Sequence, residues 1–289
     1  MNCNICPRKC NIDRDIDLGF CGASNQIKIA KYMVHNWEEP IISGNSGSGA
    51  IFFSHCNLKC AYCQNYQISC EGLGKYVSAQ QLVEIFKELE SKGVHNLNLV
   101  TPSHYAKQII DALNIYKPKV PIVWNSNGYE TEQTLEMIKD YIDVYLVDMK
   151  YMDNRLSLHL SGAKDYVEVC SKAILKMKQN QPKDILINNI IQKGVIVRHL
   201  VLPNEIENTF KVLEWLNKNL GEDCFISIMS QYTPYYKSKE MEKYNRKLKP
   251  IEYKRVINKI NELKFKNGFY QDLTSANDNF VPDFQKFKD

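Results

Sequence analysis

The chain has 289 residues, of which 44% are hydrophobic and 24% are charged, and its 37 Lys and Arg exceed its 33 Asp and Glu by a formal charge of only +4. This composition is ordinary for a globular protein with a sizeable core, and the charge is too small to favour nucleic acid as a partner. No segment has the roughly 18 successive apolar residues of a membrane span, and the first twenty residues lack the apolar stretch of a secretory signal, so we expect a cytoplasmic protein with no membrane partner.

The hydrophobic pattern predicts strands that alternate with helices along the chain. Apolar runs predict strands over residues 50–54, 97–101, 120–124, 144–148, 195–202 and 225–230. Apolar residues at helical spacing predict helices over residues 78–91, 105–116, 131–141, 166–179, 205–220 and 251–263. Six such units predict an α/β fold with a parallel sheet, closed or partly closed as a barrel. A doubly wound open sheet is the alternative, although no GxGxxG motif follows any strand.

Polar residues gather where the predicted strands end. In a parallel barrel the loops that follow the strands form the active-site rim, so we expect these residues to converge there. In chain order the candidates are Cys56, Ser103, His104, Asn125, Asn127, Asp148, Lys150, Arg198, Gln231 and Tyr232. Arg198 and His199 are neighbours in one strand, so at most one of them faces the barrel interior. His35 and the pair Glu38-Glu39 precede the first strand and could equally form a solvated turn.

Ten cysteines are many for a protein of a reducing compartment, where clustered cysteines indicate a metal or catalytic site rather than disulfides. Eight of them fall in two short groups, Cys3, Cys6, Cys10 and Cys21, and then Cys56, Cys60, Cys63 and Cys70. Cys170 and Cys224 stand apart among apolar neighbours, and we expect both to be buried, inert thiols.

The spacing Cys56-x3-Cys60-x2-Cys63 puts three thiolates on one short loop. Thiolate is the ligand that iron–sulfur clusters use, and three of them can bind three irons of a cubane cluster while the fourth iron stays open. Zinc is the alternative, but a structural zinc site needs a fourth ligand, which Cys70 or His55 would have to supply.

The first cysteine group can form a second, fully ligated metal centre. Cys3, Cys6, Cys10 and Cys21 offer four thiolates, which suit either tetrahedral zinc or an iron–sulfur cluster. The alternative is spare thiols on a frayed terminus. We assign residues 1–49 to a cysteine-rich extension with this candidate site, and residues 50–289 to the barrel core.

The second cysteine group, with aromatic Tyr62 before its third cysteine, resembles the cluster loop of the radical S-adenosylmethionine (SAM) superfamily. Residues 47–53 and 63–66, which flank the loop, resemble the branch related to pyruvate formate-lyase activating enzyme. Residues 35–40, 198–203 and 229–232 are similar to a poorly characterised activating-enzyme-like group within that branch. Together with the six strand–helix units, the resemblance implies a partial (β/α)6 TIM-type barrel with an N-terminal cysteine-rich extension.

The resemblance also implies the chemistry. Cys56, Cys60 and Cys63 would hold a 4Fe–4S cluster, and SAM would chelate the open iron through its amino and carboxylate groups. An electron from a reductant such as flavodoxin or ferredoxin would break the bond from the sulfonium to C5′. The 5′-deoxyadenosyl radical would then abstract hydrogen from a bound substrate, which the protein must position.

Matching positions suggest further roles. By resemblance, Tyr62 lies beside adenine, Lys150 with Asp148 meets the SAM carboxylate, and Asn127 belongs to an Asn-Gly after the third strand. The family's Asp-Thr before that Asn-Gly is here Asn125-Ser126, and its Gly-Gly-Glu after the second strand is replaced by residues 101–104, so Ser103 or His104 would hold the SAM amino group. We include Asn125 and Arg198 among the cofactor-binding candidates.

Three functions are compatible with these observations. The first is activation of a glycyl radical enzyme, by resemblance to the activating-enzyme branch. The second is a radical SAM enzyme that modifies a peptide or a small molecule, because the motifs after the second and third strands are altered. The third is a non-enzymatic, zinc-binding interaction module.

Overall fold

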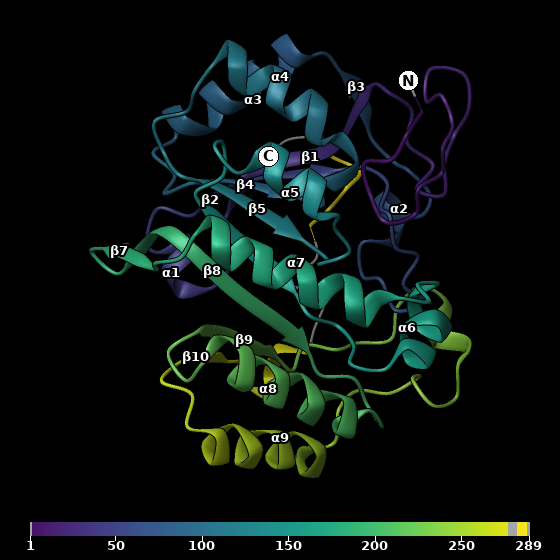
Figure 1. Cartoon of the computed structure of the whole chain (residues 1–289), viewed down its shortest axis with the longest axis vertical. Helices are drawn as coiled ribbons and strands as arrows, with labels where there is room; N and C mark the ends of the chain where they lie inside the picture. Colours follow the sequence, from purple (N-terminus) through teal and green to yellow (C-terminus); the bar gives the residue numbers. More distant parts are fainter. Residues whose placement is uncertain (1, 277–281, 288–289) are drawn as a thin grey trace.

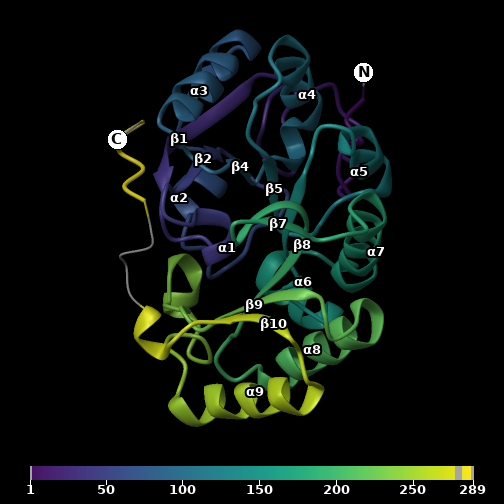
Figure 2. The same cartoon turned by 90° about the vertical axis from the view of Figure 1, so that its left-hand side faces the viewer.

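The computed structural model describes residues 2–276 and 282–287 and consists of one large sheet with helices packed around it (Figures 1 and 2). Its strands are β1 (Ile27–His35), β2 (Ser48–Phe53), β3 (Lys75–Val77), β4 (Leu97–Val100), β5 (Ile122–Ser126), β6 (Val144–Asp148), β7 (Ile185–Ile187), β8 (Ile190–Leu200), β9 (Phe225–Met229) and β10 (Asn267–Tyr270). Its α-helices are α1 (Pro40–Ser43), α2 (Tyr66–Ser69), α3 (Ala79–Ser91), α4 (Ala106–Ile115), α5 (Glu132–Ile138), α6 (Asn154–Ser161), α7 (Tyr166–Asn180), α8 (Ile206–Leu220) and α9 (Pro250–Leu263). Short 3₁₀ turns η1 (Ser103–Tyr105), η2 (Tyr236–Glu240) and η3 (Leu273–Ser275) complete the described elements.

The strand order is β10-β9-β8-β6-β5-β4-β2-β1-β3, with β7 added to β8 as a hairpin. From β10 to β2 all neighbours are parallel and follow each other in chain order, whereas β1 and β3 pair antiparallel. Chain order without a reversal is the winding of a barrel rather than of a doubly wound sheet. No hydrogen bonds between described residues join β10 to β3, so the partial barrel predicted from the sequence is confirmed.

The six predicted strands correspond to β2, β4, β5, β6, β8 and β9, and the six predicted helices to α3, α4, α5, α7, α8 and α9. Amphipathic helices such as α3 bury one stripe, Leu82, Val83, Ile85, Phe86 and Leu89, against the sheet. Ser78 caps α3 in a capping box with Gln81, which fixes where the helix begins. None of the helices in residues 2–276 and 282–287 has the length and apolar character needed to cross a membrane.

The structure adds strands that the hydrophobic pattern did not predict. β1 lies within residues 1–49, assigned above to the extension, and it pairs with β2 from Ile29↔Phe53 to His35↔Ser48. Lys28, Lys31 and His35 interrupt its apolar character. Lys31 is nevertheless buried and donates from Nζ to the carbonyl oxygen of Asp283, 3.1 Å away. The main sheet therefore begins before residue 50.

The inner face of the barrel is closed at one end and polar at the other. Near the amino ends of the strands, Val123, Val144 and Ile196 pack against Ile41 and Ile42 of α1. Towards the carboxyl ends the inward side chains become polar, with Asn125 on β5, Asp148 on β6 and Arg198 on β8. These apolar side chains fill the barrel near the amino ends of the strands, so a ligand can bind only near the carboxyl ends.

Candidate active site

A cavity of about 210 Å³ lies at the carboxyl ends of the strands, and most of the predicted site residues line it. The lining includes Cys56, Cys60, Tyr62, Cys63, Asn125, Asn127, Asp148, Lys150, Arg198, Gln231 and Tyr232. Residues from the first to the sixth predicted strand thus meet in one place, as expected for a parallel barrel.

The cysteine loop presents three sulfur atoms to this cavity, and each has its own side-chain hydrogen-bond partner. The Asn127 amide donates to Cys56 Sγ at 3.3 Å, and the Ser161 hydroxyl donates to Cys60 Sγ at 3.0 Å. The Ser69 hydroxyl lies 3.2 Å from Cys63 Sγ. Donors aimed at sulfur are what bound thiolates require.

Burial keeps the thiols of the loop protonated as long as no metal binds them. Burial and the neighbouring Cys60 together raise the pKa of Cys56 and of Cys63 to about 12. Burial also raises the pKa of Cys60. Three such thiols stay protonated at neutral pH unless a metal replaces the protons. The iron atoms of a cluster supply that positive charge.

The number and spacing of the ligands fit a cluster rather than one metal ion. Cys70 and His55, the candidates for a fourth ligand, do not line the cavity. Cys70 Sγ lies 3.6 Å from the Ser69 hydroxyl, and the His55 ring lies against Gly22 and Gly72. Among the described residues no three His, Cys, Asp or Glu side chains are arranged to hold a single metal ion. The loop therefore suits a 4Fe–4S cluster with three thiolate ligands and one open iron.

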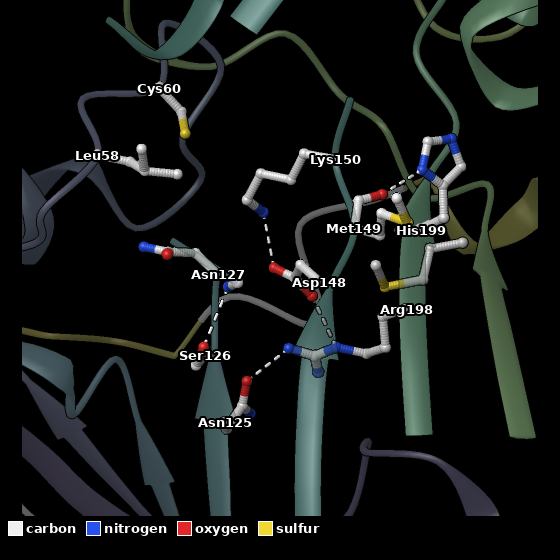
Figure 3. A network of polar contacts seen from close by, with 12 residues as sticks. Leu58, Cys60, Asn125, Ser126, Asn127, Asp148, Met149, Lys150, Arg198 and His199 are labelled. Carbon is white, nitrogen blue, oxygen red and sulfur yellow. Dashed lines mark hydrogen bonds and ion pairs between the residues drawn. The ribbon is translucent and has the colours of Figure 1, made fainter. Parts of the chain in front are cut away.

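Three charged side chains form a network in the same cavity (Figure 3). Lys150 Nζ lies 2.6 Å from one carboxylate oxygen of Asp148, and Arg198 Nε lies 2.9 Å from the other. Arg198 also donates to Asn125 Oδ1 at 2.6 Å and to Glu38 Oε2 at 3.1 Å. Arg198 is thereby fixed by partners from β5, β6 and the loop before α1.

The network keeps Lys150 positively charged beside the cysteine loop. Burial opposes ionisation of Asp148, but Lys150 and Arg198 together hold the pKa of its carboxyl below the usual value. Burial likewise opposes the charge on Lys150, but Asp148 and Cys60 raise the pKa of its ammonium. The Lys150 ammonium has three N–H donors, so its bond to Asp148 leaves donors for an anionic group of a ligand.

Tyr62 belongs to a chain of hydroxyl groups that reaches Cys60. Its hydroxyl lies 2.7 Å from that of Tyr151, which lies 2.6 Å from the hydroxyl of Ser161, the donor to Cys60. The Tyr62 ring packs at 6.0 Å from that of Tyr232. The two rings give the cavity an aromatic wall next to the cysteine loop.

Two predicted residues do not reach the cavity, and the prediction that they hold the SAM amino group needs correction. Thr101 has a φ of 60°, and η1 then turns Ser103 and His104 into the protein, where each is 1% exposed. Ser103 donates to Glu130, and His104 Nε2 lies 2.8 Å from the carbonyl oxygen of Ser54. His104 therefore supports the start of the cysteine loop.

Arg198 and His199 have separate environments, as expected for neighbours in a strand. Arg198 lines the cavity, whereas His199 is buried on the other face of β8. Its Nδ1 lies 2.6 Å from the Met149 carbonyl oxygen and its Nε2 lies 3.0 Å from the Thr209 hydroxyl. The buried positions of Cys170 and Cys224 are also confirmed.

A second cavity, of about 470 Å³, adjoins the first and shares with it Gln64, Asn65, Val100, Asn125, Arg198, Met229 and Gln231. Most of its other residues come from β9, β10 and the segment from His35 to Pro40. Glu39 is buried and Glu38 is largely buried, so neither belongs to a solvated turn, and burial raises the pKa of both despite the nearby Arg198.

Three residues that line the second cavity have a buried side-chain atom that lacks a hydrogen-bond partner within the described residues. These atoms are Nδ1 of His35, Oε2 of Glu39 and Oδ1 of Asn65. The sequence offered only a weak signal for this cavity, the acidic pair beside His35. The pairing of Glu38 with Arg198, 160 residues away, depends on the tertiary fold.

The sequence matches a family model described as the radical SAM superfamily over residues 50–216. An uncharacterized protein of Methanocaldococcus jannaschii is 30% identical over 266 residues, which cover 89% of this chain and 73% of the relative.

Solved structures share the fold at low sequence identity. SuiB of Streptococcus suis bound to its precursor peptide SuiA aligns with a TM-score of 0.51 and 14% identity over 76% of this chain and 48% of SuiB. Methylornithine synthase (PylB) aligns with a TM-score of 0.53 and 17% identity over 89% of this chain and 66% of PylB. The chain thus spans about half the length of SuiB and about two thirds of PylB.

Proposed function

The chain belongs to the radical SAM superfamily, and on that premise we propose that it cleaves SAM reductively and uses the 5′-deoxyadenosyl radical to abstract hydrogen from a substrate. The observation that carries this proposal is the cavity in which three cysteine sulfurs meet an aspartate-bound lysine. Membership of this superfamily indicates an enzyme, so a non-enzymatic zinc-binding module is no longer a candidate.

When bound, a 4Fe–4S cluster would supply the electron for SAM cleavage and an open iron for the methionyl group of SAM. The chain's own residues hold and orient these groups. Cys56, Cys60 and Cys63 would bind the cluster, Asn127 and Ser161 donate to two of the sulfurs, and Lys150 would meet the SAM carboxylate. Tyr62 and Tyr232 offer an aromatic wall for the adenine.

The hydrogen donor would bind in the second cavity, which adjoins the first through Asn125, Arg198 and Gln231. Its lining includes Glu38, Glu39 and Asn65, whose carboxylate and amide groups can accept hydrogen bonds from the N–H groups of a peptide backbone or an amine. We favour a glycine of a partner enzyme as the donor, which would make the chain an activating enzyme, with a one-electron protein such as flavodoxin or ferredoxin as reductant. Peptide modification is the second candidate, because SuiB, which shares the fold, binds a precursor peptide.

The reaction is tested by measuring 5′-deoxyadenosine after anaerobic reconstitution with iron and sulfide, reduction by dithionite and addition of SAM. We expect the product from the wild-type protein and from Cys70→Ala, whose thiol does not line the cavity, and only background from Cys60→Ala. Wild-type turnover by Cys60→Ala, or loss of iron in Cys70→Ala, would contradict the proposed ligand set.

The choice of substrate is tested separately. We expect a glycyl radical signal by electron paramagnetic resonance when the active protein is mixed with a partner glycyl radical enzyme. If no glycyl radical enzyme from the same organism gives this signal while 5′-deoxyadenosine forms, the activating role is wrong and peptide substrates take its place.

A further inference from the structure

The first cysteine group has no part in the reaction proposed above. Cys3, Cys6, Cys10 and Cys21 lie before residues 50–216, the part of the chain that matches the radical SAM family. Cys6 and Cys21 are buried, and Cys3 and Cys10 are partly exposed. Four thiols in a short polar segment need a separate explanation.

The segment is anchored to the core and is not a frayed terminus. The carbonyl oxygen of Ile5 accepts hydrogen bonds from the hydroxyls of Thr131 and Thr134, at the start of α5. The Arg14 guanidinium is buried and donates to the carbonyl oxygens of Ala23 and His104. These contacts order the loop although it contains little regular structure.

Backbone contacts bring the four thiols together. Cys3 exchanges hydrogen bonds with the residues after Cys10, from Cys3 N to Ile12 O at 2.7 Å and from Asn11 N to Cys3 O at 3.0 Å. Gly19 packs so closely on Cys10 that a Cβ at this position would lie 2.9 Å from Sγ. Cys21 and Cys3 lie near enough to Cys6 for their charges to add to the effect of burial, and together these effects raise the pKa of the Cys6 thiol to about 12.

Backbone N–H groups point at these sulfurs in the same way as in the radical SAM loop. Leu58 N donates to Cys56 Sγ, two residues before it, at 3.4 Å. Ala23 N donates to Cys21 Sγ at 3.4 Å, again across two residues. The backbone N–H of Arg8 likewise donates to the Cys6 sulfur, two residues earlier in the chain. Phe20 N donates to Cys10 Sγ at 3.3 Å. Donors of this kind stabilise thiolates that bind a metal.

We propose that Cys3, Cys6, Cys10 and Cys21 hold a second iron–sulfur cluster, fully ligated by four thiolates. Zinc fits less well, because tetrahedral coordination at about 2.3 Å brings the sulfurs to about 3.8 Å from each other. No three side chains of the metal-binding types have such an arrangement in the described part of the chain. The same holds for Cys56, Cys60 and Cys63, whose arrangement does not suit a single metal ion, whereas a cluster separates its thiolate ligands by several atoms.

The second cluster would also fasten the radical SAM loop. Arg8, between Cys6 and Cys10, donates from Nε to the carbonyl oxygen of Asn57 at 2.9 Å and from the guanidinium to that of Gly162. Asn57 follows Cys56, and Gly162 follows Ser161, the donor to Cys60. A rigid N-terminal loop would therefore hold Arg8 in place, and through its contacts it would help to position Cys56 and Cys60.

The test uses a full-length variant that lacks the radical SAM ligands, Cys56→Ala/Cys60→Ala/Cys63→Ala, reconstituted anaerobically with iron and sulfide. We expect it to retain about two to four iron atoms per chain with equal sulfide, and a cluster signal by Mössbauer spectroscopy. Stoichiometric zinc in the purified variant, or no iron after reconstitution, would overturn the proposal.

Single substitutions then assign the ligands in that variant. Adding Cys10→Ala, at a partly exposed ligand, should lower the iron content at least several-fold, whereas adding Cys224→Ala, a buried thiol far along the chain, should not change it. Equal iron in the two proteins would contradict the assignment. Circular dichroism of both proteins verifies that each is folded, so that a loss of iron reports on the ligand.

Discussion

Hydrogen bonds to the cysteine sulfurs set how easily the proposed cluster accepts an electron. The Ser161 hydroxyl donates to Cys60 Sγ at 3.0 Å and favours the reduced, more negative cluster. We predict that Ser161→Ala lowers the reduction potential by about 40 mV, which corresponds to about 1 kcal/mol for one lost hydrogen bond. A redox titration followed by electron paramagnetic resonance measures this shift.

Ser157→Ala is the matched control, because Ser157 is a buried serine of the same helix that donates to the carbonyl oxygens of Asn154 and Ala163. Its potential should equal that of the wild-type protein. Equal shifts in both variants would mean that Ser161 acts through the packing of α6 and not through Cys60.

Lys150 is the residue expected to recognise the SAM carboxylate. A hydrogen bond between charged groups contributes about 1.5–3 kcal/mol, so Lys150→Ala should raise the Kd for SAM roughly 10- to 150-fold. Calorimetric titration of the reconstituted protein with SAM measures the change. Lys178→Ala removes a lysine with a similar partner, Asp184 at 2.8 Å, outside both cavities, and should leave the Kd unchanged. An unchanged Kd in Lys150→Ala would remove this residue from the SAM site.

At the scale of single elements, the two faces of β8 have different roles: one faces the cavity and the other packs against α8. Arg198 points into the cavity, and His199 on the other face joins the Met149 carbonyl oxygen to α8 through Thr209. Burial lowers the pKa of His199 to about 4, well below the value near 6.5 of an unfolded histidine. As the pH falls below 6.5 the unfolded chain takes up a proton that the folded chain does not, so stability decreases.

We therefore predict a pH-dependent difference between the wild-type protein and His199→Gln. Lowering the pH from 8 to 5.5 should cost the wild-type protein about 1.4 kcal/mol of unfolding free energy relative to the variant. Anaerobic urea unfolding at each pH measures this, and the difference cancels contributions common to both proteins. A difference that does not change with pH would show that His199 is not held neutral.

Periodicity predicted the elements that obey a simple pattern and missed those that do not. The parallel strands are continuous apolar runs, and helices such as α3 have a clear apolar stripe and a capping residue, Ser78. β1 was not predicted because its lysines interrupt the apolar pattern, although most of the strand is buried. β10 was not predicted because Asn267 and Gly268 are uncommon in strands. Strands that depend on pairing partners distant in the chain carry little local signal.

At the scale of the whole molecule, the sequence predicted those site residues that directly follow a parallel strand. Cys56, Asp148 and Lys150 converge because parallel strands end on one rim. Ser103 and His104 failed because a single residue in a left-handed conformation, Thr101, redirects the chain. Glu38 was not assigned to the site because its pairing with Arg198 joins residues that are 160 positions apart in the chain.

SAM is proposed to occupy an open iron beside Cys56, Cys60 and Cys63. Electron–nuclear double resonance of the reduced protein, with SAM that carries ¹⁷O in its carboxylate, measures this contact. We expect a coupling between the label and the cluster in the wild-type protein and in Cys70→Ala. A reduced cluster whose spectrum shows no coupling to the label, and no change when SAM is added, would contradict this proposal.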